Sequence, residues 1–195
     1  MPVTKRQLTP DTTLFPVPVV LITCGTGDEA NVFSLNRIAS CNAEPPMISI
    51  SVRPSRASHD LLEQGEAFVV NIPGPDMEVV SDFVGSTTLR KTDKWMETGL
   101  VQKPAVFVKP PLLADCLVNL ECRVRHTLRL PSHSLFVAEV IAVHADDSVL
   151  NDRGEVDFNL VTGLVYRSGA VRERPVDKFK PVNLLADVNA WRDGR

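Results

Sequence analysis

The sequence predicts a mainly β protein, an antiparallel barrel with a few helices at its ends. Several segments alternate apolar and polar residues with a period of two, as half-buried strands do. The 15 prolines among 195 residues divide the chain into many short elements. The long helices that connect neighbouring parallel strands are missing, which favours antiparallel pairing and closure into a barrel.

The composition is that of one ordinary globular domain, with 44% hydrophobic and 23% charged residues. A net charge of −3 argues against a nucleic-acid binder, which usually carries a basic excess. No apolar run reaches about 18 residues, so no membrane span is expected, and the polar N-terminus favours a cytoplasmic protein. The cysteine spacing fits neither a metal site nor a disulfide framework, and it predicts free thiols at Cys24, Cys41, Cys116 and Cys122.

Apolar runs bounded by glycine and proline predict the strands. They lie at residues 17–24, 31–42, 47–53, 67–72, 118–130 and 135–145. In the fifth run the alternation predicts a solvated charged face and an apolar face that includes His126 as a core histidine. The turn at 131–134 predicts a hairpin between the last two runs.

Two helices are predicted between the strands. One spans about ten residues from Arg56, with Ser55 as its N-cap and Gly65 as its C-cap. A second begins near Asp76, and its apolar spacing predicts one buried face made of Val79, Val80, Phe83 and Val84.

Two segments of the sequence are less regular, residues 86–104 and the residues after Tyr166. Residues 86–104 are predicted to form a loop in which Trp95 packs against the core. After Tyr166 the pattern decays, and residues 172–181 are predicted to form an extended arm, with a short helix near 184–191.

The strongest local signal for function is the segment Arg53-Pro54-Ser55-Arg56-Ala57-Ser58, which joins a predicted strand to a predicted helix. Helix N-termini offer free N–H groups to anions, and arginine can bind phosphate through two parallel hydrogen bonds. The serines add hydroxyl donors. The segment is therefore either a phosphate site or a solvated turn with two surface arginines.

A second signal runs from Asn31 to Asn42, where small and amide side chains cluster in an extended segment. Such a backbone can approach a flat ligand closely, although a polar edge strand has the same composition. Motifs for dinucleotide binding, a P-loop, a zinc protease or a nucleophilic serine are missing from the chain.

Together, the ordered series PxPVVLIT, N-x-x-S, N-x-x-PPM, S-V-R-P-S-R-x-S and H-x-x-F-x-x-E-V resembles the flavin reductase-like, FMN-binding split-barrel family, in particular its flavoredoxin-type branch. The resemblance covers residues 14–166. It implies a split barrel that works as a homodimer, with FMN bound non-covalently near the subunit interface. NADH or NADPH would be the reductant, and a monooxygenase is one implied redox partner.

The resemblance also implies which residues contact the flavin. Asn31 and Ser34 would contact the ribityl-phosphate part, and Lys94 would lie near the flavin, in its own chain or reaching from the partner subunit. His133 matches a histidine near the nicotinamide site of the reductases. The main chain at Ala39, Ser40, Cys41 and Asn42 would contact the isoalloxazine edge, and the phosphate would be held by Arg53, Ser55, Arg56 and Ser58. No catalytic side chain is implied, because the flavin carries the chemistry.

The resemblance divides the chain into an N-terminal arm (1–13), a flavin reductase-like domain (14–168) and a C-terminal extension (169–195). The implied function is an FMN-dependent oxidoreductase, which reduces flavin with NAD(P)H or passes electrons to a partner. The alternatives are a non-catalytic flavin-binding or electron-carrier module, and a domain without flavin. The chain departs from the family at Ala57, where an aromatic is usual, and at residues 36–38, where Trp or Thr-like residues are usual.

Overall fold

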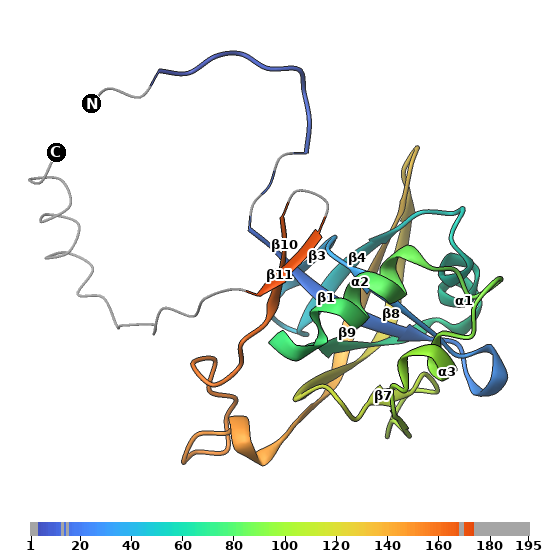
Figure 1. Ribbon diagram of the computed structural model, residues 1–195, viewed down its shortest axis with the longest axis vertical. Coiled ribbons are helices and arrows are strands. Elements are labelled where there is room, and N and C mark those ends of the chain that lie inside the picture. Colours follow the sequence, from blue (N-terminus) through green and yellow to red (C-terminus); the bar gives the residue numbers. More distant parts are fainter. Residues whose placement is uncertain (1–3, 13, 15, 168–169, 174–195) are drawn as a thin grey trace, which may run out of the picture.

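The computed structural model describes residues 4–12, 14, 16–167 and 170–173, and its strands form a barrel flanked by short helices (Figure 1). The strands are β1 (Val17–Cys24), β2 (Asn31–Leu35), β3 (Ile38–Asn42), β4 (Met47–Val52), β5 (Ala67–Ile72), β6 (Gln102–Lys103), β7 (Leu112–Leu113), β8 (Val118–Arg129), β9 (Ser134–Ala145), β10 (Leu164–Arg167) and β11 (Ala170–Glu173). The helices are α1 (Ala57–Gly65), α2 (Glu78–Ser86) and α3 (Lys94–Thr98), with single 3-10 turns at Gly27–Glu29, Pro75–Met77 and Asp147–Val149.

All strand pairs of the main sheet are antiparallel, in the order β11-β10-β1-β5-β8-β9-β4-β3, and β2 also pairs with β1. Strands β2 and β3 therefore lie at opposite ends of the curved sheet, although they are consecutive in the chain. Asn36 and Arg37 connect them, and no backbone ladder joins β2 to β3 among the described strands. The predicted mainly β, antiparallel split barrel is confirmed, and the split lies at this connection.

The barrel interior is filled by alternate residues of its strands. Ile48, Ile50 and Val52 are 9%, 0% and 4% exposed, so the predicted alternation of β4 is confirmed. They pack with Phe68 and Phe136 in the main core cluster. Such burial removes apolar side chains from water, which contributes about 1.5–3 kcal/mol for each large side chain.

A second core cluster lies outside the barrel, where α2 covers β1 and β2. Leu21 of β1 and Val32 of β2 contact Val84 there, and Val80 and Phe83 pack at its edge. The predicted apolar face of this helix is wrong at Val79, which is 80% exposed because the buried stripe of the helix runs through Val80 and Val84 instead. Helix and strand approach closely at Gly85, where an added Cβ atom would lie 3.0 Å from Cβ of Ser34.

Helix α1 begins and ends one residue later than the cap predictions require. Arg56, not Ser55, is the N-cap residue, and its side chain makes no capping hydrogen bond. At the other end Gly65 is still helical, and Glu66 adopts the left-handed conformation with φ of 50°. The N–H of Glu66 bonds to the carbonyl of Leu62, so this bond ends the helix without a glycine at the left-handed position.

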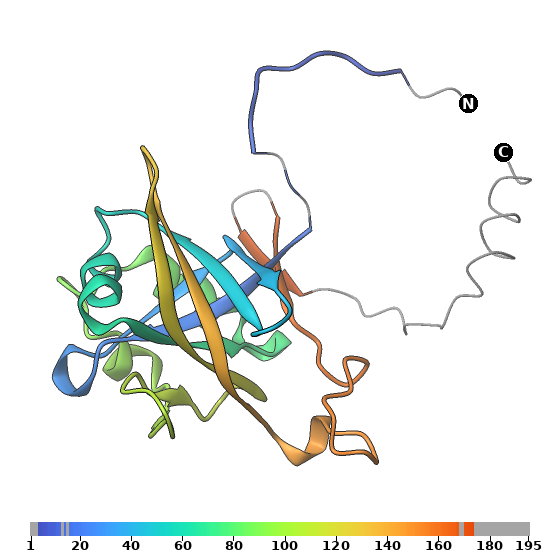
Figure 2. The same ribbon diagram turned by 180° about the vertical axis from the view of Figure 1, so that it is seen from behind.

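The predicted hairpin of β8 and β9 is confirmed, but its burial differs from the prediction. Strand β5 pairs with β8 only as far as Arg123, and beyond that residue the hairpin projects from the barrel (Figure 2). His126 is therefore exposed and is not a core histidine. On the face predicted to be solvated, Glu121 is fully buried and accepts hydrogen bonds from the backbone N–H groups of residues 106–108.

The structure also bears on the predictions for the segment 86–104, the cysteines and the C-terminal segment. The segment 86–104 is not all loop, because it contains α3, and Trp95 packs against the outer core as predicted. The four cysteines are free, and Cys41 is exposed. Strand β11 continues the sheet to Glu173, whereas the predicted helix near 184–191 lies outside the described residues. In the described part of the chain, no helix is long and apolar enough to cross a membrane.

Candidate functional site

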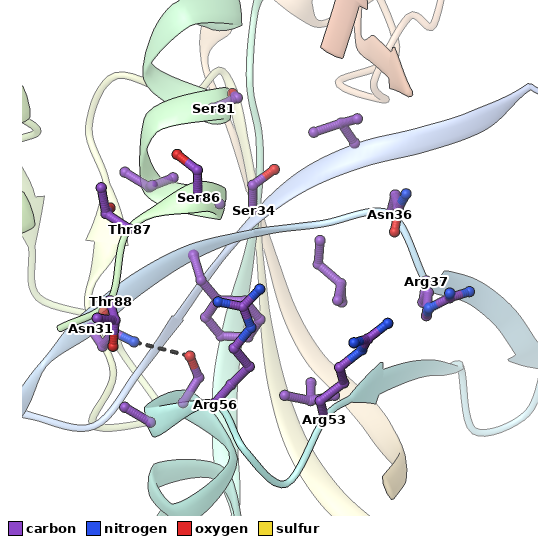
Figure 3. A pocket seen from close by; sticks show the side chains of 18 of the residues that line it. Asn31, Ser34, Asn36, Arg37, Arg53, Arg56, Ser81, Ser86, Thr87 and Thr88 are labelled. Carbon is purple, nitrogen blue, oxygen red and sulfur yellow. Dashed lines mark hydrogen bonds between the residues drawn. The ribbon is translucent and has the colours of Figure 1, made fainter. Parts of the chain in front are cut away.

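A pocket with a volume of about 470 Å³ lies beside the connection between β2 and β3, at the split of the barrel (Figure 3). Its floor is formed by β2 and the Asn36–Arg37 connection, one wall by the end of β4 and the start of α1, and the opposite wall by α2 and the turn after it. Volumes of this order are typical of small-molecule sites. Of the residues predicted for the site, seven line this pocket: Asn31, Ser34, Arg53, Arg56, Ser58, Lys94 and His133.

The start of α1 presents donors to the pocket. Arg56, Ala57 and Ser58 line the cavity. The N–H of Arg56 bonds to the carbonyl of Arg53, whereas the N–H groups of Ala57 and Ser58 lie at the start of the helix and have no partner among the described residues. The Ser58 hydroxyl is buried and accepts a hydrogen bond of 3.0 Å from Nδ2 of Asn31. The positive end of the helix dipole and the Arg56 guanidinium favour an anion at this point.

Lys94 is buried beneath the pocket and is 2% exposed. The Asp93 side chain caps α3 and so fixes the position of Lys94 at its first residue. Nζ donates to the carbonyls of Val32 on β2 and Val84 on α2, at 2.7 and 2.8 Å. Burial, opposed by Cys24 and assisted by Arg56, lowers the pKa of Lys94 to about 8. Lys94 thus lines the pocket of its own chain.

Two buried polar atoms of the pocket wall have no hydrogen-bond partner among the described residues, Oδ1 of Asn31 and Oγ of Ser81. Asn31 is 1% exposed and Ser81 0%. Buried polar atoms are normally hydrogen-bonded, and leaving one unsatisfied costs about 1–3 kcal/mol. Both residues line the cavity, so a ligand with hydroxyl groups could satisfy them.

The pocket carries an excess of positive charge. Arg37, Arg53 and Arg56 line it, and none of them forms a salt bridge within the described part of the chain. His133 lies at the same pocket, and its pKa is lowered, first by burial and then by the charges of Arg37 and Arg53. A neutral imidazole and unpaired guanidinium groups therefore face a cavity that suits an anionic ligand.

Five predicted residues lie outside the cavity. Ser55 is exposed in the turn before α1. Ala39, Ser40, Cys41 and Asn42 belong to β3, the last strand of the sheet order, and are also exposed. The pocket reaches the start of this strand at Arg37, directly before Ile38, and among the described strands β3 pairs only with β4.

The opposite wall was not predicted from the sequence. Ser81, Gly85 and Ser86 of α2 line the pocket with Thr87 and Thr88 of the following turn. Thr87 and Ser86 both donate to the carbonyl of Phe83, which closes the helix end. The run of hydroxyl residues at 86–88 was the available signal, but it resembles an ordinary helix end and loop.

The arrangement combines three kinds of binding group in one cavity: an anion site at the start of α1, hydroxyl and amide groups along both walls, and an open backbone edge beyond. Such a set can hold an elongated ligand with a phosphate at one end, a polyol chain and a flat polar ring. Within the described residues, no group of His, Cys, Asp and Glu side chains is placed to bind a metal ion.

Comparison with known proteins places this site in a family. Residues 12–173 match the model of the flavin reductase like domain. Flavoredoxin from Methanosarcina acetivorans has a similar structure, with a TM-score of 0.85 and 25% identity over 96% of this chain and 100% of that one. Nitrilotriacetate monooxygenase component B from Bacillus cereus shares the fold, with a TM-score of 0.76 and 15% identity over 87% and 89% of the two chains.

A relative found by sequence comparison supports the same family. The NADH-dependent flavin reductase StyB from Pseudomonas fluorescens is 27% identical over 132 residues, which cover 66% of this chain and 72% of that protein. The family model spans nearly the whole described barrel, and it includes every residue that lines the pocket. The chain belongs to the flavin reductase-like family.

Proposed function

We propose that this protein is an FMN-binding oxidoreductase that takes electrons from NADH or NADPH and passes them to flavin or, through bound flavin, to a redox partner. The single observation that carries the proposal is the pocket at the barrel split, where a helix N-terminus, unpaired cations and unsatisfied buried polar atoms converge. When bound there, FMN would supply the hydride and electron chemistry, while the protein orients it and tunes its surroundings.

The phosphate of FMN is assigned to the start of α1. The Arg56 and Ser58 side chains would donate to its oxygens together with the backbone N–H groups of Ala57 and Ser58. In Figure 3 the Arg56 side chain runs toward Ser34 and Ser86, into the cavity. Ser55 is exposed and does not line the cavity, so its side chain is not assigned this role, and Arg53 lies on the side of Arg37 (Figure 3).

The ribityl chain is assigned to the walls. Its hydroxyl groups could donate to the unsatisfied Oδ1 of Asn31 and pair with Oγ of Ser81 and Ser34. Lys94 holds β2 and α2 together behind this surface, so it acts mainly by fixing the walls and by adding positive charge.

The isoalloxazine ring is assigned to the edge of β3, next to the pocket. The N–H of Ser51 bonds to the carbonyl of Arg37 at 3.0 Å, and Ala39 is paired with Ser49 in the same ladder. Since hydrogen-bonded pairs alternate along antiparallel strands, Ala39 faces β4, whereas the backbone groups of Ser40 face outward. These free groups suit the polar edge of a flat ring.

An exposed β3 edge would leave a ring there in water, and a second subunit would cover it. We therefore propose a homodimer with the flavin near its interface. His133 would lie at the nicotinamide side of the ring, and its lowered pKa keeps it neutral near pH 7. The acceptor that follows the flavin is proposed to be a protein, with a monooxygenase as one candidate.

A second candidate function is a flavin-binding electron carrier without nicotinamide oxidation. Similarity to flavoredoxin over 96% of the chain favours it. The two candidates share the flavin site and differ in the electron donor. One experiment separates them.

Purified protein is mixed with FMN, desalted, and reduced anaerobically with NADH or with NADPH while the visible absorption band of oxidised flavin is recorded. Retention of the band supports the flavin site, and its bleaching by a nicotinamide supports the reductase. A retained band that bleaches only with a protein or chemical reductant supports the carrier. A colourless protein that also fails to oxidise NAD(P)H with free FMN or FAD overturns both.

A further inference from the structure

The pocket carries cations on two sides, and the flavin phosphate uses only one of them. Arg56 stands at the start of α1, above the buried Lys94. Arg37 stands in the connection between β2 and β3, and Arg53 directly follows β4. Figure 3 shows the Arg53 side chain running toward Arg37, away from Arg56.

Backbone pairing places Arg37 and Arg53 on neighbouring segments. The hydrogen bond from the N–H of Ser51 to the carbonyl of Arg37 continues the β3–β4 ladder up to the barrel split. Arg53 follows Ser51 by two residues, so it lies beside the same connection. Both guanidinium groups lie close enough to His133 for their charges to lower its pKa. Two unpaired arginines and a neutral imidazole therefore share one end of the cavity.

The charge balance of the cavity leaves this end unsatisfied. Asp82 is the one acidic residue that lines it, against Arg37, Arg53, Arg56 and Lys94. One phosphate monoester carries about −1.5 to −2 charges at pH 7, which matches the end formed by Arg56 and Lys94. After FMN has bound there, Arg37 and Arg53 would still form no salt bridge within the described part of the chain.

We propose that Arg37 and Arg53 form a second phosphate-binding site of this pocket, which binds a phosphate group of the nicotinamide nucleotide that reduces the flavin. The inference rests on the proposed function and deepens it. Paired arginines bind phosphate oxygens bidentately, which lysine cannot do. The phosphate has two sources: the diphosphate that NADH and NADPH share, or the 2′-phosphate that NADPH alone carries.

The test uses nucleotide fragments that lack the reactive ring. ADP and 2′,5′-ADP are titrated calorimetrically into FMN-loaded protein, first unchanged and then as Arg37→Ala and Arg53→Ala. We expect at least a tenfold weaker binding of one or both fragments in each variant. Loss for 2′,5′-ADP alone assigns the site to the 2′-phosphate of NADPH, and loss for both fragments assigns it to the diphosphate.

Two further variants make the result specific. Arg153→Ala removes an exposed arginine that does not line the pocket, and it should leave both affinities unchanged. Arg37→Lys keeps the charge but loses the bidentate geometry, and its affinity should lie between those of the original protein and Arg37→Ala. An Arg37→Lys variant as weak as Arg37→Ala still supports bidentate binding.

Two results would overturn the second site. One is unchanged affinity for both fragments in Arg37→Ala. The other is loss of FMN retention by Arg37→Ala as complete as that of Arg56→Ala, which would place Arg37 in the flavin site. Failure of the proposed function looks different, because the unchanged protein would then retain no FMN and would also fail to oxidise NAD(P)H with free FMN or FAD. If the unchanged protein oxidises NAD(P)H but loses FMN on desalting, the fragment titrations are run with excess free FMN, so that the Arg56 end stays occupied.

Discussion

At the scale of single residues, Arg56 offers the most direct test of the flavin site. Arg56→Ala removes a charged donor at the start of α1 but leaves the helix, whose N-cap makes no side-chain hydrogen bond. Hydrogen bonds to charged groups contribute about 1.5–3 kcal/mol, so the dissociation constant of FMN should rise about 10- to 150-fold. Fluorescence titration of FMN measures it, and an unchanged constant would remove this helix end from the phosphate site.

Lys94 gives the site a pH dependence. Its pKa of about 8 lies in a range where the charge is lost on mild alkalinisation, mainly because the side chain is buried. We expect FMN affinity to fall as the pH rises through about 8, since a neutral amine no longer attracts the phosphate. A bound phosphate would raise this pKa and move the fall to higher pH.

Stability should change in the opposite direction, which separates the two effects. The folded-state pKa lies below the ordinary lysine value of 10.5, so the unfolded chain binds more protons between about pH 8 and 10.5. The contribution of Lys94 to the free energy of unfolding therefore increases with pH in this window. Weaker FMN binding there, together with a flat or rising urea midpoint, assigns the loss to the charge. An FMN constant that does not change between pH 7 and pH 9.5 contradicts it.

Much of the site could be foreseen residue by residue, but only where the local pattern carried chemistry. Arg56 and Ser58 were identifiable because a strand end, two arginines and a helix start occur within six residues. Asn31 was noticed as the start of the amide-rich segment 31–42, but Lys94 and the flavin contact of Asn31 entered only through the family resemblance. The two residues are 63 positions apart, and their meeting at the pocket depends on how α3 packs against β2. Arg37 was missed because an isolated arginine in an extended segment has no distinguishing pattern.

At the scale of elements, the free edge of β3 carries the next prediction. Ser40→Pro removes an N–H that faces away from β4, and proline is tolerated on edge strands. The variant should therefore fold with nearly normal stability and yet retain little FMN, because the isoalloxazine edge loses a donor. Ala39→Pro instead removes an N–H of the β3–β4 ladder, and it should lower the melting temperature. Ser40→Ala, which keeps the N–H, is the matched control.

The readouts are the flavin content after desalting and the midpoint of thermal unfolding. A folded Ser40→Pro protein with normal flavin content would show that the ring lies elsewhere. Loss of flavin in Ser40→Ala would mean that the hydroxyl, not the backbone, is the contact.

Among the elements, strands were predicted better than helix ends. The alternation in β4 has one physical cause, burial of every second side chain, so it can be read directly. The end of α1 depends instead on one residue in the left-handed conformation, and Glu66 adopts it because the Leu62 bond and the following strand fix the chain. The exposure of His126 depends on where β5 ends beside β8, which no local pattern in β8 contains.

At the scale of the whole molecule, the antiparallel barrel was predictable, but the position of its split was not. The segment 31–42 reads as one extended run, whereas the structure divides it at Asn36 and Arg37 and places its halves at opposite ends of the sheet. This division creates the pocket. It also leaves β3 with one edge that no described strand pairs with, and unpaired edges are usually covered, because they otherwise promote aggregation.

The proposed homodimer would provide that cover, and it predicts that flavin retention depends on assembly. Light scattering coupled to size exclusion should give twice the mass of one chain for the FMN-loaded protein. On dilution below the dimer dissociation constant, flavin should be released as the mass falls, because the ring then loses one of its two walls. Ser40→Pro should still dimerise if its effect is confined to the ring contact. A monomer that keeps FMN at normal affinity would contradict both the dimer and a shared site, and it would place the whole flavin inside the cavity of one chain.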